Sequence, residues 1–375
     1  MATNERKVAL VVGATGMVGL TLVESLSDPN SSSTSSSWKI YAVARQPKPS
    51  YFPTISCHYI ECDVLDELDT QSKFSELSDV THVFWVVRHI RETEEDNCKV
   101  NSLMLRNVLE VLLTHAPKLQ HICLQTGTKQ YMGPIFDTIL GSKVTPHEAP
   151  FKEDSPRHPF PMFYYDLEDI LIEFSNKKQG LLTWSVHRSS IIHGASTRSL
   201  HNGLLTLLVY ALICKHEGMA FRFPGCKYSW EHFFDASDAD LLAEQQIWAA
   251  TTEKAKNQAF NCSNGDVFTW KSMWKVVANL VGVEYVPFNG AGFDLPVAMK
   301  DKAQVWDAIV FENGLFETKL EEITCFEVSQ AVLNFRFQHV CSMNKSKEYG
   351  FLGFRNTLKS VESWVGKLRE MKIIP

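Results

Sequence analysis

The chain has 375 residues, of which 45% are hydrophobic, and its formal net charge is −6. This size suits one large α/β unit or two closely packed domains with a well-buried core. The acidic balance and the absence of long basic runs argue against a nucleic-acid partner. Its nine cysteines form no C-x-x-C pair, which indicates reduced thiols rather than a disulfide framework or a metal site.

The N-terminus runs straight into a strand-like segment and has no feature of a signal or transit peptide. No apolar run reaches the roughly 18 residues that a membrane span requires. The longest, LLTLLVYALICK, suits a buried helix better. We therefore expect a cytoplasmic protein without a membrane span.

Apolar segments alternate with amphipathic helical patterns through the first half of the chain. The predicted strands span residues 8–12, 39–44, 58–64, 82–87, 121–127 and 182–192. Continuous apolar strands that alternate with helices are typical of a parallel sheet covered on both faces. Helical patterns dominate after residue 195. The sequence thus predicts a Rossmann-type, doubly wound sheet in residues 1–194 and a smaller, mainly helical substrate-binding lobe in residues 195–375.

Three glycines follow the first predicted strand, in VALVVGATGMVG. In such a G-x-x-G-x-x-G pattern one glycine makes a tight turn, one lets the backbone approach a pyrophosphate, and one lets the helix pack close to the strand. The helix that follows directs backbone N–H groups and its positive dipole end at the phosphates. The pattern therefore predicts a dinucleotide site. The contacts expected in this loop are Gly13, Thr15, Gly16, Met17, Val18 and Gly19.

The end of the second predicted strand, YAVARQP, bears on the choice of cofactor. Arg45 stands where an NAD-dependent enzyme usually carries an acid that binds the ribose 2′-hydroxyl. A guanidinium suits a 2′-phosphate instead, which favours NADPH/NADP+ over NADH. The alternative is that Arg45 only solvates a loop. Asp63, after the third strand, is expected to accept a hydrogen bond from the adenine amino group.

Two adjacent tyrosines stand at the start of a predicted helix in FYYDLEDI, residues 163–170. A short-chain dehydrogenase would have a lysine four residues after its catalytic tyrosine, but position 168 is Glu. Lys129 lies just past the fifth strand, at the sheet edge where ligands bind, and the helix begins near the same edge. We therefore predict that Lys129 and Tyr164 are neighbours in space and that Tyr165 packs in the interior.

The stretches TGTKQYMGP, FKEDSPRHPFPMFYYDLEDI and SMNKSKEYGFLGFRN resemble the plant progesterone 5β-reductase/iridoid synthase-like enzymes, which are atypical extended short-chain dehydrogenases. The resemblance covers nearly the whole chain. It implies NADPH-dependent 1,4-reduction of C=C bonds in small-molecule enones or enals, and it leaves a homodimer open. It also implies that Tyr164 and Lys129 are catalytic and contact the cofactor. The further cofactor contacts that it implies are Thr126, Gly127 and Ile191.

The expected chemistry gives both catalytic residues a task. Hydride attack on the β-carbon of an enone puts negative charge on the carbonyl oxygen, which the Tyr164 hydroxyl would stabilise. A cationic Lys129 would orient the ribose and favour proton donation by Tyr164. Two other interpretations stay open: a carbonyl reductase of the same fold, and a non-catalytic NADPH-binding sensor.

The segments expected around the substrate depart from the family. Val87 and Arg88 replace a Thr-Trp pair, and RSSIIHGASTRSLHN replaces a segment like RPGIIFGFSPYSMMN, which predicts a more polar and more basic pocket. A buried guanidinium needs a partner, so Arg88 is expected to pair with an acid such as Glu92 or Glu327, or with a carboxylate on the substrate. The expected substrate contacts are Arg88, Tyr131, His193, Arg198, His201, Asn202 and Ser329.

Overall fold

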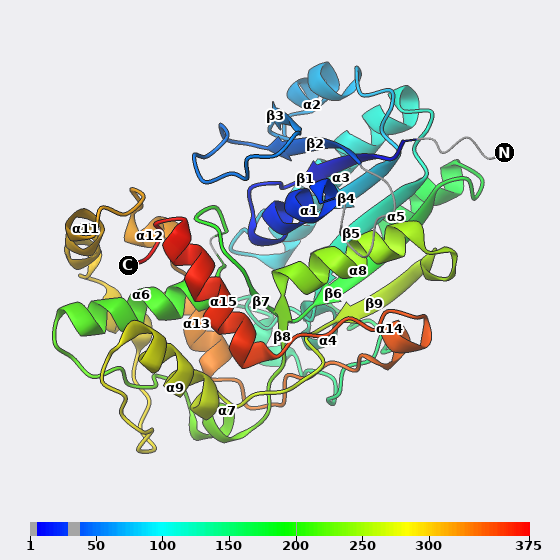
Figure 1. Cartoon of the computed structure of the whole chain (residues 1–375). Coiled ribbons are helices and arrows are strands. Elements are labelled where there is room, and N and C mark those ends of the chain that lie inside the picture. The colour runs from blue at the N-terminus through cyan, green and yellow to red at the C-terminus, as the bar shows by residue number, and fades with distance from the viewer. Residues whose placement is uncertain (1–5, 29–37, 200) are drawn as a thin grey trace.

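The computed structural model describes residues 6–28, 38–199 and 201–375. Its centre is a wholly parallel seven-stranded sheet in the order β3-β2-β1-β4-β5-β6-β9 (Figure 1). The strand order reverses direction between β1 and β4, where doubly wound sheets bind ligands. The strands are β1 (Val8–Val12), β2 (Lys39–Ala44), β3 (His58–Glu61), β4 (His82–Trp85), β5 (His121–Gly127), β6 (Thr183–Ser189) and β9 (Gln258–Cys262). The predicted Rossmann-type fold is confirmed.

Helices cover both faces of this sheet and bury two separate cores (Figure 1). The covering helices are α1 (Met17–Ser27) and α8 (Ala239–Thr251) on one face, and α2 (Glu67–Phe74), α3 (Glu94–His115) and α5 (Phe163–Lys177) on the other. Successive side chains of a strand point to opposite faces. Ala9 and Val11 accordingly belong to the first core, whereas Leu10 and Val12 belong to the second. Burial on both faces is the reason β1 is an unbroken apolar run.

The second half of the chain adds a mainly helical lobe. Two short helices, α4 (Lys129–Met132) and η1 (Gly141–Lys143), come before it, between β5 and α5. The helices of the second half are α6 (Gly203–His216), α7 (Lys227–Glu231), η2 (Glu253–Ala255), α9 (Trp270–Val281), α10 (Leu295–Met299), α11 (Ala303–Glu312), α12 (Leu320–Ile323), α13 (Phe326–Leu333), α14 (Asn344–Glu348) and α15 (Thr357–Glu370). Residues 204–214 of α6 are all buried, which is expected of a helix that is apolar all round. Within the described residues, no helix is both long and apolar enough to span a membrane.

Three of the predicted strands end earlier than expected. The third ends at Glu61 and the fourth at Trp85. The sixth breaks at Ser190, and the chain continues as β7 (Ile191–His193), which leaves the main sheet to pair with β8 (Ala236–Asp238). Ser190 fixes this break, because its backbone N–H donates to Ser237 Oγ at 2.8 Å instead of continuing the ladder.

The seventh strand of the sheet comes from the second half of the chain. β9 pairs with β6, and α8 packs beside α1 over the same sheet. Residues 239–262 therefore return to the Rossmann unit after the chain has left it. The boundary at residue 194 stays a prediction, and segments from both sides of it contribute strands to the same sheet.

Candidate active site

A cavity of about 760 Å³ lies at the carboxyl ends of β1, β2, β4 and β5. The start of α5, the segment that follows β7 and the neighbourhood of α12 form the rest of its wall. This volume is within the range of pockets that enclose small ligands and cofactors. Its position at the reversal of strand order is where a doubly wound sheet binds a dinucleotide.

The glycine-rich loop forms the floor of the cavity beside β1. Gly13 has a φ of +99°, and a Cβ there would lie 3.0 Å from Val87 Cβ, so only glycine suits this turn. A Cβ on Gly19 would collide with the carbonyl oxygen of Gly13, which shows that Gly19 lets α1 pack against the loop. Gly16 provides no side-chain cap for α1. The N-terminal N–H groups of α1 therefore point to where an anion can bind.

A segment from beyond β7 is hydrogen-bonded to this loop. Ser196 Oγ donates to the carbonyl oxygen of Thr15 at 2.7 Å, and the N–H of Met17 donates to Ser199 Oγ at 3.0 Å. Sequence reasoning missed these two serines. They join the segment after β7 to the loop after β1, about 180 positions earlier in the chain, at the expected phosphate site. No local pattern marks them, because their partners come from the opposite end of the Rossmann unit.

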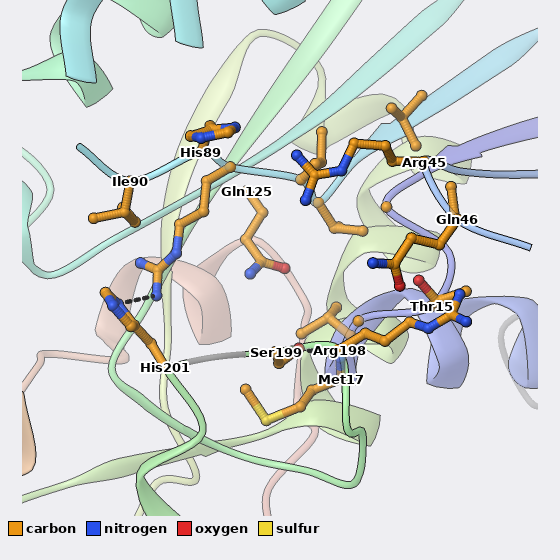
Figure 2. Close-up of a pocket in the computed structure, with 18 of the residues that line it drawn as sticks. Thr15, Met17, Arg45, Gln46, His89, Ile90, Gln125, Arg198, Ser199 and His201 are labelled. Carbon is orange, nitrogen blue, oxygen red and sulfur yellow. Dashed lines mark hydrogen bonds between the residues drawn. The ribbon is translucent and has the colours of Figure 1, made fainter. Parts of the chain in front are cut away.

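Arg198 lies at the same end of the cavity as Arg45 and Gln46 (Figure 2). Its Nη1 donates to the carbonyl oxygen of Pro47 at 2.7 Å, and Tyr59, close to Arg198, donates to the carbonyl oxygen of Gln46 at 2.6 Å. Figure 2 shows His89, Ile90 and His201 on the other side of the cavity, with Gln125 between the two groups. The structure thus places Arg198 away from the expected substrate position and beside the loop after β2.

Glu94 joins the two residues expected to be catalytic. Lys129 Nζ donates to Glu94 Oε2 at 2.7 Å, and the N–H of Phe163 donates to Glu94 Oε1 at 3.1 Å. One carboxylate therefore holds both the lysine and the first turn of the helix that carries Tyr164. Burial lowers the pKa of Lys129, whereas the negative charge of Glu94 acts to raise it. Sequence reasoning missed Glu94, because it stands in an acidic run that resembles a solvated helix start.

The Tyr164 hydroxyl faces the cavity and accepts a hydrogen bond from Arg88 Nη1 at 3.4 Å. Arg88 Nη2 lies 3.2 Å from His201 Nδ1. A Cβ on Gly127 would lie 3.3 Å from the tyrosine oxygen, so a glycine there leaves room beside this hydroxyl. Within the described residues, Tyr164 donates no hydrogen bond to the protein. Its proton is thus available to a bound molecule.

Glu168, one helical turn after Tyr164, has a different task. It forms a buried ion pair with Arg188 of β6, with Oε1 at 3.0 Å from Nη2. The position that carries a lysine in a short-chain dehydrogenase therefore faces the interior and neutralises an arginine. Tyr165 packs there as predicted, donating to the carbonyl oxygen of Gln130 at 2.9 Å.

The structure brings some of the predicted residues to the cavity and leaves others away from it. Those that line it are Gly13, Thr15, Gly16, Met17, Val18, Arg45, Asp63, Arg88, Thr126, Tyr164, Arg198 and His201. Thr126 Oγ1 is buried without a hydrogen-bond partner among the described residues, as expected if a ligand supplies one. Gly19, Gly127, Lys129 and Ile191 do not line the cavity, and Ile192 lines it instead of Ile191.

Four predicted substrate contacts are instead buried away from the cavity wall. Tyr131 donates to Asn261 Oδ1 at 2.5 Å in the core, and Asn202 caps α6 through the N–H of Leu205. Ser329 is buried on α13. His193 is buried beyond β7, where burial lowers its pKa to about 4. The structure gives no support to a substrate contact for these residues, because lobe packing turns each of them inward.

Comparison with known proteins agrees with this geometry. The family model described as the PRISE-like Rossmann-fold domain matches residues 9–375. The chain belongs to the PRISE-like family. It is 50% identical to an (S)-8-oxocitronellyl enol synthase of Camptotheca acuminata, covering 99% of this chain and 94% of that protein. It is also 50% identical to a 3-oxo-Δ4,5-steroid 5β-reductase of Arabidopsis thaliana, covering 98% and 93%. The family predicted from the sequence motifs is confirmed.

More distant solved structures share the fold. An epimerase of Methanothermobacter thermautotrophicus has a TM-score of 0.68 at 14% identity, covering 98% of this PRISE-like chain and 93% of the other. The UDP-glucose 4-epimerase of Thermus thermophilus, solved in complex with NAD, has a TM-score of 0.64 at 15% identity, covering 96% and 99%. At this identity the likeness shows that the PRISE-like chain has the fold of extended nucleotide-sugar epimerases, and nothing about its substrate.

Proposed function

We propose that the protein is an NADPH-dependent reductase that adds hydride to the C=C bond of an enone or enal. The observation that carries this proposal is the Tyr164 hydroxyl, which faces the cavity with its proton uncommitted and accepts a hydrogen bond from Arg88. Two relatives at 50% identity are named as an (S)-8-oxocitronellyl enol synthase and a 3-oxo-Δ4,5-steroid 5β-reductase. The names fit the predicted class of enzyme, a reductase of activated C=C bonds.

The residues at the sheet edge suit a dinucleotide. The glycine turn at Gly13 lets the backbone come close to a pyrophosphate, and the start of α1 borders the cavity, where Ser199 Oγ accepts the N–H of Met17. Thr126 also lines the cavity, and its buried Oγ1 has no hydrogen-bond partner among the described residues. A reduced nicotinamide, when bound, supplies a hydride. Lys129, held by Glu94, would position the ribose beside Tyr164.

The task of Tyr164 follows from where charge develops. The β-carbon of the enone receives the hydride, the C=C π pair shifts to the bond between the α-carbon and the carbonyl carbon, and the C=O π pair moves onto the oxygen to give an enolate. The Tyr164 hydroxyl donates to that oxygen and stabilises the charge, as donors in an oxyanion hole do. A proton then adds to the α-carbon, which gives the saturated carbonyl compound. Removing one such donor typically costs about 10²–10³ in rate.

The preference for NADPH over NADH rests on two arginines. Arg45 follows β2 where the ribose of the adenosine half would lie, and Arg198 lies at the same end of the cavity. Guanidinium groups bind phosphate through charge-assisted hydrogen bonds. The proposal therefore assigns both arginines to the 2′-phosphate. Arg198, first expected to contact the substrate, becomes a cofactor residue.

The proposal also includes a cytoplasmic location and leaves a homodimer open. All nine cysteines are free thiols in the structure, which is compatible with a reducing compartment. Size-exclusion chromatography with light scattering measures the oligomeric state directly.

The deciding experiment is an NADPH-oxidation assay with product identification. Substrates would be 4-phenylbut-3-en-2-one, a steroid enone and 8-oxogeranial. We expect the saturated carbonyl compound as product. An allylic alcohol would show a carbonyl reductase of the same fold. Tight binding of NADPH without turnover of any enone or enal would show a non-catalytic sensor and would reject the proposal.

A further inference from the structure

Arg88 carries a charge beside Tyr164 that no acid among the described residues neutralises. It follows β4 at the carboxyl edge of the sheet and lines the cavity. It is exposed, whereas the sequence predicted a buried guanidinium, so it does not require a partner within the protein. Its two terminal nitrogens lie 3.4 Å from the Tyr164 oxygen and 3.2 Å from His201 Nδ1. Neither Glu92 nor Glu327, the acids expected to pair with it, forms an ion pair with Arg88, and no other acid of the described chain does so.

His201 does not supply the missing negative charge. Burial, together with the nearby cations Arg88 and Lys129, lowers its pKa to about 3. The ring is therefore neutral in the physiological range, and its Nδ1 accepts a hydrogen bond from the guanidinium. This contact aims the guanidinium without neutralising it, so the remaining N–H groups stay available to the cavity.

The other charges around the site are already matched or lie on another wall. Lys129 is paired with Glu94 at 2.7 Å. Glu317, Glu321 and Glu322 line the cavity at and before α12. None of these three makes an ion pair with Arg88 in the described structure. A cation that faces a cavity with its counter-charge absent is suited to bind an anionic ligand there.

We propose that the substrate is an enone with a carboxylate bonded to its carbonyl carbon, a 2-oxo-3-enoate, and that Arg88 binds this carboxylate. The inference rests on the proposed reductase function. Tyr164 must reach the ketone oxygen, and Arg88 Nη1 lies 3.4 Å from the tyrosine oxygen. The two groups therefore bind oxygens that are close neighbours on the substrate. An α-keto acid provides such a pair, one oxygen on each of two bonded carbons, and the fork of a guanidinium matches a carboxylate.

The reaction on this substrate balances as for a simple enone. The hydride forms a new C–H bond at C4, the C3=C4 π pair becomes the C2=C3 bond, and the C2=O π pair moves onto the ketone oxygen to give the enolate. When a proton adds at C3, the C2=C3 pair forms the new C–H bond and the oxygen pair restores the C2=O bond. The product is a 2-oxoalkanoate, and NADPH is oxidised to NADP+. The carboxylate at C1 does not react. Its contact with Arg88 holds the ketone oxygen towards Tyr164, and the guanidinium also stabilises the enolate.

The test compares 2-oxo-4-phenylbut-3-enoate with its methyl ester, which keeps the activated C=C bond without the charge. The measured quantity is the acid-to-ester ratio of kcat/KM, in the wild type, Arg88→Gln and Arg88→Lys. We expect the wild type to favour the acid and Arg88→Gln to reduce the ratio about 10- to 100-fold. Arg88→Lys should restore part of it, because it keeps the charge but not the fork. Arg91→Gln, an exposed arginine outside the cavity wall, is the matched control and should leave the ratio unchanged.

The outcomes separate this inference from the reductase proposal. A wild-type enzyme that does not favour the acid, or an Arg88→Gln ratio equal to that of the wild type, overturns the carboxylate assignment. If Arg88→Gln loses affinity for NADPH while its acid-to-ester ratio of kcat/KM stays as in the wild type, Arg88 binds the cofactor, and the carboxylate assignment is overturned as well. If the wild type reduces neither the acid, the ester nor 4-phenylbut-3-en-2-one, the reductase function itself fails. Thermal unfolding of each variant checks that the fold is retained.

Discussion

Glu94 Oε2 and Lys129 Nζ form an ion pair of 2.7 Å in which the glutamate side chain is only 2% exposed. The other carboxylate oxygen accepts the N–H of Phe163, the residue before Tyr164. The first residue of α3 thereby fixes the loop after β5 and the start of α5 relative to each other. Glu94 acts on the reaction through Lys129 and α5, so it is a positioning residue.

We expect Glu94→Gln to reduce turnover about tenfold or more, because the lysine loses the negative charge that is paired with it. It should also move the alkaline limb of the pH–kcat profile to lower pH. Burial lowers the pKa of Lys129 and Glu94 opposes this effect, so without the carboxylate the lysine loses its proton at a lower pH. Steady-state kinetics from pH 6 to 10 measures the limb. Glu95→Gln, in the exposed pair with Lys99, is the control. An unchanged limb in Glu94→Gln contradicts the assignment.

We expect Tyr164→Phe to lower kcat about 10²–10³-fold and to leave the Kd for NADPH nearly unchanged, because the hydroxyl acts on charge that develops only in the reaction. Cofactor fluorescence titration and steady-state rates on an enone give the two quantities. Wild-type turnover in this variant would remove the central mechanistic claim. Partial activity confined to enals would indicate substrates reactive enough to need little help from the hydroxyl.

Arg45→Ala and Arg198→Ala should each weaken NADPH binding about tenfold and change NADH binding little. A hydrogen bond to a charged group contributes roughly 1.5–3 kcal/mol, and only NADPH carries the 2′-phosphate. Isothermal titration with 2′,5′-ADP and with 5′-AMP isolates this phosphate from the rest of the cofactor. If Arg198→Ala leaves the difference between the two ligands as in the wild type, Arg198 is not a phosphate residue, whatever the result for Arg45.

Glu168→Gln should destabilise the fold by about 3–5 kcal/mol, because it leaves Arg188 as a buried charge without its counter-ion. The side chains of this pair are 6% and 9% exposed. The control is Glu173→Gln on the same helix, whose pairs with Arg106 and Lys177 are about half exposed and should cost at most about 1 kcal/mol. Urea unfolding followed by circular dichroism compares the two. Equal midpoints would show that the buried pair contributes no more than the exposed ones.

Much of the Rossmann unit could be predicted because its signals are local. β1, β2 and β5 have the predicted bounds, since an apolar run between turn residues defines a strand buried on both faces. The glycine loop could be predicted because Gly13 and Gly19 each meet a steric limit that only glycine satisfies. β9 was missed, because a short strand after a helical stretch gives no local sign that it returns to the sheet.

The sequence by itself determined the fold class, the family, the glycine turn and the candidate pair Tyr164 and Lys129, because each depends on a residue and its near neighbours or on a specific motif. Only the tertiary structure decided which end of the cavity a loop residue reaches. Arg198 lies at the same end as Arg45 because the nearby Ser196 donates a hydrogen bond to the carbonyl oxygen of Thr15. These two residues are 181 positions apart in the sequence. His201, three positions after Arg198, meets Arg88 on the other side. Two residues only three positions apart can therefore reach opposite ends of a ligand site, because contacts with residues far away in the sequence fix the path of the chain between them.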